Sequence, residues 1–124
     1  IMNKQIKELE EILQYSYKNK SLVTKALTHK SFSNHNNEKL EFLGDRVLGL
    51  IISKELLEKY PNEKEGVIDK KFANLVNKKT CVEIAKKLKL EKFVILGSSN
   101  KNLERSANKI LSDCLEAIVG SIYL

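Results

Sequence analysis

The stretch NEKLEFLGDRVLGL, residues 37–50, decides the fold of this 124-residue chain. Its apolar residues recur at helical spacing, and two acids, Glu41 and Asp45, stand four positions apart among them. On a helix, that spacing puts both carboxylates on one face. The pattern predicts a long helix over about residues 37–60, which Pro61 ends because proline cannot continue a helix.

A second acidic pair lies in ILSDCLEAIVGSIYL, residues 110–124, where Asp113 and Glu116 also share a helix face. The segment holds no Lys or Arg, and the nearest basic residue is Lys109. Carboxylates beside a core are costly without partners, and two like charges ~4 Å apart repel by roughly 4 kcal/mol at an effective dielectric near 20. Four converging acids therefore require protons or a bound cation. Clustered oxygen ligands favour Mg²⁺ or Mn²⁺.

The first pair has an alternative interpretation. Glu41 and Asp45 could form an exposed polar edge, or they could pair with Arg46 or Lys39. For this pair considered alone, an exposed or ion-paired role is as well supported as a metal site. Taken together, the two pairs favour a divalent metal site built from two helices.

The rest of the chain predicts an all-α domain. Apolar residues at helical spacing mark further helices at about residues 3–14, 21–27, 66–77, 80–88 and 106–124. Ser21 is the expected N-cap of the second of these. The segment 28–37 is polar and loop-like, and FVIL (93–96) is a short apolar run. Gly44 and Gly49 weaken the long helix, which indicates close packing against another helix or a ligand.

The composition limits the kinds of binding partner that we expect for this chain. A formal net charge of +6 favours a polyanion. No apolar run is long enough to span a bilayer, and no secretory signal is seen, so we expect a cytoplasmic protein without a membrane partner. Cys81 and Cys114 lack CxxC spacing. We therefore expect neither a zinc site nor a disulfide, and Cys114 is predicted to be a small buried thiol.

These motifs together resemble a known family. HKSFSN (29–34) followed by NEKLEFLGDRVLGL closely resembles the defining motif of the ribonuclease III family. ILSDCLEAIVGSIYL resembles that family's second acidic helix, and YPNEKEG (60–66) matches the segment between them. The resemblance covers essentially the whole chain. One departure is SSNKNLERSANK (98–109), where family members often carry a glycine-rich, acidic stretch.

The resemblance implies a fold, a dimer and a set of site residues. The fold would be the helical ribonuclease III endonuclease domain, and the chain would form a homodimer. Four acids match the family's metal-binding and catalytic positions: Glu41, Asp45, Asp113 and Glu116. Two more match acids that line the cutting valley: Glu38 and Glu65. Phe42, which without the family would be ordinary core or interface, matches an aromatic that inserts into the second subunit.

The same resemblance implies an activity. The chain would be a ribonuclease III that uses Mg²⁺, or Mn²⁺ in its place, to hydrolyse double-stranded RNA. The ends would be staggered, with 5′-phosphates and 3′-hydroxyls. The role would be the processing of rRNA and mRNA precursors. No small-molecule cofactor would take part. Residues 1–124 would be the catalytic domain, without the double-stranded-RNA-binding domain that usually follows. The alternative is a non-catalytic RNA-binding or scaffold protein of the same fold.

The histidines and lysines give weaker signals. Neither histidine has a second ligand at short spacing, so we expect His29 to pack or cap rather than catalyse, and His35 to be solvated. The pairs Lys70–Lys71, Lys78–Lys79 and Lys86–Lys87 are typical of solvated faces. One of these pairs could contact phosphate, and the sequence does not distinguish which.

Overall fold

The structure is a computed structural model that describes residues 3–98 and 107–124, and within them the chain is all-helical, as predicted. The elements are α1 (Asn3–Leu13), α2 (Lys20–Leu27), α3 (Glu38–Lys59), α4 (Glu65–Leu75), α5 (Lys78–Lys87), the 3₁₀ turn η1 (Leu90–Lys92) and α6 (Ala107–Tyr123). Most of the divergent segment 98–109, and the expected helix start at Ser106, lie outside the described residues.

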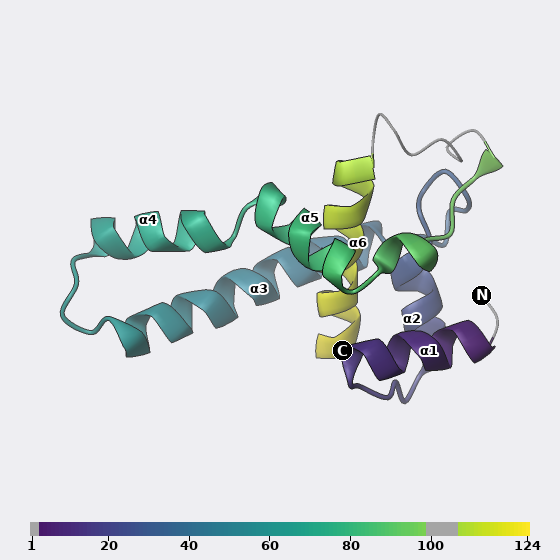
Figure 1. Cartoon of the computed structure of the whole chain (residues 1–124), viewed down its shortest axis with the longest axis horizontal. Coiled ribbons are helices and arrows are strands. Elements are labelled where there is room, and N and C mark those ends of the chain that lie inside the picture. Colours follow the sequence, from purple (N-terminus) through teal and green to yellow (C-terminus); the bar gives the residue numbers. More distant parts are fainter. Residues whose placement is uncertain (1–2, 99–106) are drawn as a thin grey trace.

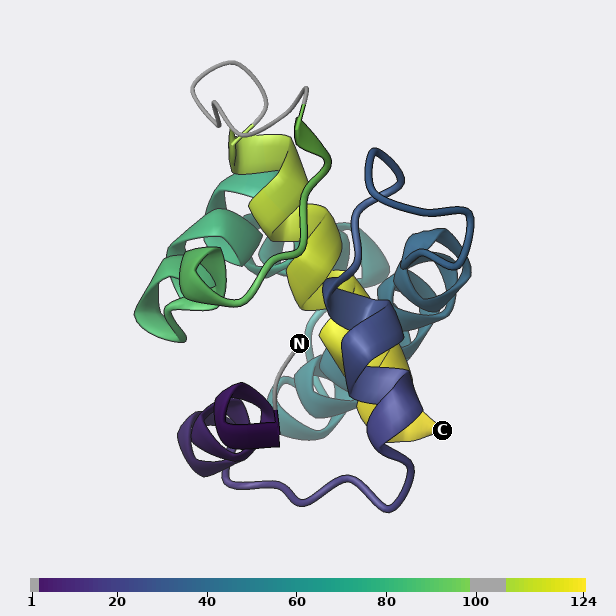
Figure 2. The ribbon, with the colours of Figure 1, turned by 90° about the vertical axis from the view of Figure 1, so that its right-hand side faces the viewer.

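The C-terminal helix α6 is the centre of the domain. It packs against α3, α5 and α2, which surround it in the two ribbon views (Figures 1 and 2). Most of its apolar residues are buried because three helices cover it. The hydroxyl of Tyr17 lies 2.6 Å from that of Ser121, so a polar group deep in the core is satisfied.

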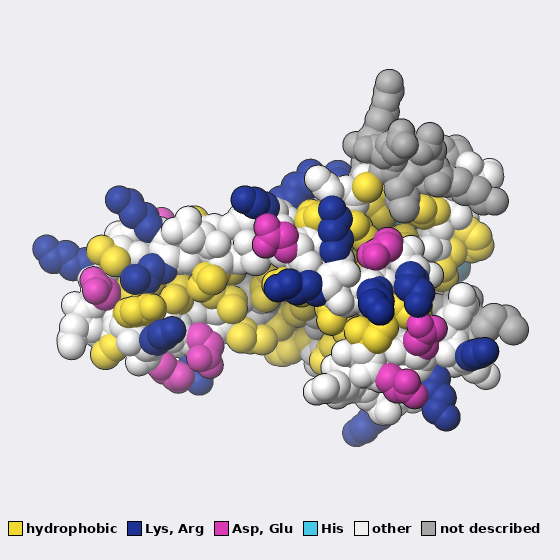
Figure 3. Space-filling model, in the orientation of Figure 1, with side chains coloured by type: hydrophobic (Ala, Val, Ile, Leu, Met, Phe, Trp, Pro, Cys, Tyr) yellow, Lys and Arg dark blue, Asp and Glu magenta, His cyan; other side chains and the backbone are white. Residues whose placement is uncertain are grey.

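Helices α3 and α4 form an arm that projects from this body (Figure 1). Pro61 lies in the turn between them, where the sequence predicted the end of α3. No residue of α4 is buried, and α3 exposes Leu50 and Leu57 by 67% and 62%. Hydrophobic side chains accordingly follow the arm in Figure 3, with lysines along its outer edge. The domain alone leaves this apolar surface uncovered.

Asparagines cap two of the helices, one of them in place of the expected Ser21. Asn19 caps α2 and accepts a hydrogen bond from the N–H of Ser21, so Ser21 itself lies inside the helix. Asn77 caps α5 and accepts from the N–H of Thr80 at 2.8 Å, which starts α5 two residues earlier than expected. Both helices begin earlier because an asparagine oxygen satisfies an N–H of the first turn.

The structure also bears on the expectations about membrane-spanning segments and about the two cysteines. Among the described residues, no helix has the length and apolar character needed to cross a membrane. Cys81 and Cys114 are both buried free thiols, as expected for Cys114. Burial raises the pKa of Cys114 to about 12, so this thiol stays protonated.

Candidate metal centre

Two glycines allow α3 and α6 to cross at backbone distance. A Cβ added to Gly44 would lie 1.6 Å from the main-chain oxygen of Glu116, and one added to Gly120 would lie 2.2 Å from that of Leu40. Any side chain at either position would collide with the other helix. Gly49, in contrast, would bring its Cβ only to 3.7 Å from the Phe72 ring, an ordinary contact. Close packing was therefore correctly inferred for Gly44.

The crossing brings acids from both helices together. Glu41 of α3 lies one turn before Gly44, and Asp113 and Glu116 of α6 lie before Gly120. Carboxylate oxygens of Glu41, Asp113 and Glu116 all lie within 4.8 Å of one another, and all three side chains are half-buried. Residues more than 70 positions apart thus present one cluster of oxygen atoms.

Asp45, the fourth predicted acid, borders this group. It forms a hydrogen bond with Glu116, and its Oδ2 also accepts from Arg46 Nη1 at 2.5 Å. The pairing with Arg46 is the alternative that the sequence left open for Asp45, and here it coexists with the contact to Glu116. Because 47% of the Asp45 side chain is exposed, water screens its ion pair with Arg46.

The crowding of acids shifts their protonation. Burial raises the pKa of Glu116 to about 8, and the hydrogen bond and charge of Asp45 add to the shift. Burial likewise raises the pKa of Glu41 to about 6, with further contributions from the charge and hydrogen bond of Asp113. Burial and the neighbouring acids thus both disfavour a negative charge on Glu41 and on Glu116. Glu116 therefore holds a proton near neutral pH unless a cation replaces it.

Lys109 supplies one positive charge to the cluster. Its Nζ donates to Asp113 Oδ2 at 2.8 Å, four residues further along α6. This hydrogen bond raises the pKa of Lys109, and the charges of Glu41 and Glu116 act in the same direction. The sequence contained the signal, since i and i+4 residues are neighbours on a helix. The second acidic pair thus has a cationic partner just outside the segment 110–124.

Two cavities open on the acids. The first, of about 400 Å³, is lined by Asp45, Asp113 and Glu116 together with Lys78 and Cys81. Burial raises the pKa of Cys81, with smaller effects from the charges of Glu116 and Asp45. Nothing in the motif had connected Cys81 or Lys78 to the acids, because α5 comes beside α6 only in the folded chain.

The second cavity, of about 310 Å³, is lined by Glu41 and Asp113 with His29, Lys30 and Glu38. Lys109 borders both cavities. Burial lowers the pKa of His29, and the charge of Lys30 acts in the same direction. His29 thus lies in a cavity that it shares with two of the clustered acids, whereas His35 is exposed in the same loop.

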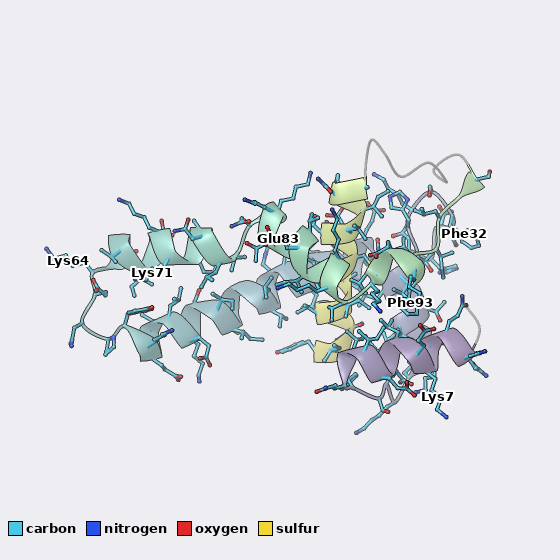
Figure 4. The ribbon with its side chains drawn as sticks, viewed as in Figure 1. Lys7, Phe32, Lys64, Lys71, Glu83 and Phe93 are labelled. Carbon is cyan, nitrogen blue, oxygen red and sulfur yellow. The ribbon has the colours of Figure 1, made fainter. Side chains whose placement is uncertain are left out.

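The other predicted residues lie elsewhere. Glu65 opens α4 at the far end of the arm, next to Lys64, well away from α6 (Figures 1 and 4). Phe42 is 63% exposed on α3, and the Arg46 guanidinium lies 4.5 Å from the centre of its ring. Of the three lysine pairs, the one at the start of α5 contributes to the acid-lined cavity through Lys78.

The donor set fits a hard divalent cation. Three carboxylates within reach of one another and a fourth beside them supply the clustered oxygen ligands that Mg²⁺ or Mn²⁺ prefers. A thiol lines the cavity, but Cys81 is not among the residues whose ligand atoms come together. The chemistry of the site is therefore that of oxygen ligands.

Comparison with known proteins identifies relatives of the whole chain. A family model described as "Ribonuclease-III-like" matches residues 19–124. Ribonuclease 3 of Pelagibacter ubique is 60% identical over 119 residues, which are 94% of this chain and 53% of that protein. Ribonuclease 3 of Campylobacter jejuni is 45% identical over 123 residues, or 98% and 55%. The chain thus spans about half the length of the curated relatives it matches.

Solved structures agree with the fold. The crystal structure of the nuclease domain of ribonuclease III from Campylobacter jejuni superposes with a TM-score of 0.90 at 44% identity, covering 97% of this chain and 83% of that one. A second structure of that domain, described as flexible in a region involved in dimer formation, gives a TM-score of 0.91 at 44% identity over 95% and 84%.

Proposed function

The chain belongs to the ribonuclease III family, and from this premise we propose that it is a metal-dependent endoribonuclease that hydrolyses double-stranded RNA. The observation that carries the proposal is the meeting of acids from α3 and α6 at the Gly44–Gly120 crossing. A scaffold protein of the same fold would have no need for half-buried carboxylates whose protonation is so strongly perturbed. Residues 1–124 would form the catalytic domain.

The four acids share one task in this proposal. Glu41, Asp45, Asp113 and Glu116 would hold Mg²⁺, or Mn²⁺ in its place. When bound, the ion would supply charge neutralisation at the scissile phosphate and activation of water. Glu41 and Glu116 would give up their protons to it, because a bound cation would offset the burial and the neighbouring acids that raise their pKa values to about 6 and 8. Lys109 would keep Asp113 oriented towards the site.

The products follow from the same chemistry. Hydrolysis by water at the phosphorus, with the 3′-oxygen as the leaving group, gives 5′-phosphate and 3′-hydroxyl ends. No covalent enzyme intermediate is needed. Staggered ends require that each strand be cut at its own site, which a dimer with two-fold symmetry supplies.

A homodimer is proposed on the evidence of the uncovered arm. Phe42, Leu50 and Leu57 all expose more than half of their side chains along α3. Exposed apolar surface of this kind marks interaction sites. Glu65 lies too far along the arm to reach its own chain's acids, so a role in the cutting valley requires that the second copy bring it there.

The test is cleavage of long duplex RNA by the purified chain, with Mg²⁺, with Mn²⁺ and with EDTA. We expect cutting with either ion, none in EDTA, and none of single-stranded RNA of the same sequence. Ligation-dependent mapping of the ends should show 5′-phosphates. Duplex binding without cutting in either ion, while a known ribonuclease III cuts the same substrate, would favour the non-catalytic RNA-binding alternative.

A further inference from the structure

His29 is held in one orientation by the loop around it. The N–H of His29 donates to the carbonyl of Ile95 at 2.9 Å, next to the bridge between Thr28 and Ile95. In both ribbon views the loop after α2 runs beside the segment after η1 (Figures 1 and 2). Gly97 closes the arrangement, since a Cβ there would lie 2.2 Å from the Ser31 carbonyl oxygen, and its N–H donates to Ser31 Oγ at 3.0 Å.

These contacts decide which ring nitrogen carries the proton. The backbone N–H of Ser31 donates to His29 Nδ1 at 3.1 Å, and an N–H can only donate. Nδ1 must therefore be unprotonated, and Ser31 Oγ, 2.7 Å away, donates to it as well. In the neutral imidazole the proton is then on Nε2. Among the described residues, no group forms a hydrogen bond with Nε2.

The tautomer excludes one role and favours another. A histidine that binds a metal ion through Nε2 needs a lone pair there, and the Ser31 contacts keep the lone pair on Nδ1. His29 is thus a neutral hydrogen-bond donor in the cavity that Lys30, Lys109 and three acids, Glu38, Glu41 and Asp113, also line. The ammonium groups of Lys30 and Lys109 and the Nε2–H of His29 are all donors beside the clustered acids. Such donors can bind the oxygen atoms of a nucleic-acid backbone.

We propose that His29 is an RNA-binding residue whose Nε2–H donates a hydrogen bond to a sugar–phosphate oxygen beside the scissile bond. The inference rests on the proposed function and adds a contact that the acids do not make. The acceptor is either a ribose 2′-hydroxyl or a non-bridging phosphate oxygen, since both accept from a neutral N–H. His29 is then more than the packing or capping residue that the sequence predicted.

Two substitutions at His29 test the roles of Nδ1 and Nε2 separately. His29→Asn places an amide oxygen where Nδ1 accepts from Ser31, but it removes the Nε2 donor. His29→Gln carries an amide N–H out to the position of Nε2, but it removes the Nδ1 acceptor. Binding to labelled duplex RNA is measured in the Glu116→Gln background with Mg²⁺, so that the substrate survives, and thermal melting is recorded for each variant without RNA.

We expect one substitution to affect only RNA binding and the other to affect only stability. His29→Asn should melt like its parent and bind the duplex about 3- to 10-fold more weakly, the scale of one net hydrogen bond. His29→Gln should melt at a lower temperature and bind within about 2-fold of its parent, since the donor is kept. Ser31→Ala should also lower the melting temperature. A purely structural His29 would instead lower melting and binding together.

Modified duplexes identify the acceptor. A single 2′-deoxyribose or a single neutral methylphosphonate is placed in turn at each position next to the cut, and each is combined with His29→Asn in a double-mutant cycle. Coupling to the 2′-deoxy position supports a ribose hydroxyl as the acceptor, and coupling to the methylphosphonate supports a phosphate oxygen. The absence of coupling at every position tested overturns the proposal.

The result also distinguishes this inference from the function on which it rests. A parent that binds duplex RNA while His29→Asn binds equally tightly overturns the role of His29 and leaves the nuclease proposal standing. A wild-type chain that neither binds nor cuts duplex RNA overturns both.

Discussion

Gly44 of α3 lies so close to Glu116 of α6 that an added Cβ would come within 1.6 Å of the Glu116 main-chain oxygen. This contact sets how closely the two helices cross. The acids of each helix lie within one turn of the crossing, so its geometry places Glu41 near Glu116 and Asp113. Gly44 and the clustered acid Glu116 are in this way parts of one arrangement.

Gly44→Ala should destabilise the domain. Alanine favours a helix by up to ~1 kcal/mol over glycine, but here the collision with α6 forces the helices apart, at a cost of about 3 kcal/mol or more. Chemical denaturation measures the free energy of unfolding. Gly49→Ala in the same helix is the matched control, and it should be neutral or slightly stabilising because its Cβ meets only an ordinary contact. Equal stability of the two variants would contradict the close crossing.

Glu116→Gln and Asp45→Asn should each abolish most cutting. Either change removes one negative charge with little change of shape, so the cation is held less well. We expect cleavage of duplex RNA to fall by about 100-fold or more, the scale of losing one group that stabilises charge in a transition state. Glu91→Gln, an exposed acid in η1, is the control. A variant that cuts at the wild-type rate while folded would remove that acid from the site.

Stability without metal should fall as pH rises. The folded-state pKa of Glu116 is raised to about 8, above its ordinary value of 4.5. Between these values the folded chain binds a proton that the unfolded chain has lost, so the stabilisation present below pH 4.5 disappears as pH rises through 8. Glu41 acts in the same direction over a narrower range, up to about 6.

Thermal melting in EDTA from pH 5 to 9 measures this dependence. Glu116→Gln cannot titrate at position 116, so the difference in melting temperature between it and the wild type should grow in favour of the variant as pH rises. A difference that stays constant with pH would show that the Glu116 pKa is not raised. In Mg²⁺ or Mn²⁺ the ion should displace the protons, so its affinity should increase over the same pH range.

Phe42→Ala should weaken dimerisation. If the ring inserts into a second subunit, its removal should cost about 2 kcal/mol of association free energy, as for a buried aromatic hot spot. Analytical ultracentrifugation over a range of concentrations measures the dissociation constant. Phe32→Ala removes a phenylalanine of similar exposure, 59% against 63%, from the loop after α2 and is the control. Identical sedimentation of the wild type and Phe42→Ala would exclude Phe42 from the interface.

Lys78→Ala should weaken duplex binding in a salt-dependent way. Lys78 lines the cavity that holds Asp45, Asp113 and Glu116, so it lies where the backbone of a bound strand would pass. Loss of one phosphate contact should reduce the slope of log affinity against log salt by about 1. Lys7→Ala on α1, at the opposite side of the body (Figure 4), should leave the slope unchanged. Equal slopes for the two variants would exclude Lys78 from phosphate binding.

Much of the helical architecture was predictable from local pattern. Pro61 ended α3 where expected, and the apolar spacing located each helix to within a few residues. The starts of α2 and α5 were missed because Asn19 and Asn77 satisfy the first N–H groups. Local capping competes with periodicity at a helix end, and the pattern of apolar residues does not report it.

The sequence by itself determined that two helices each carry a pair of acids on one face, since four- and three-residue spacings have that consequence on any helix. Only the tertiary structure decided that the pairs meet, that Lys78 and Cys81 come beside them from α5, and that Glu65 stays apart at the end of the arm. Helix faces follow from backbone geometry within a few residues. The distance between helices depends on which positions let two backbones touch, and that is known only once Gly44 and Gly120 are seen against each other.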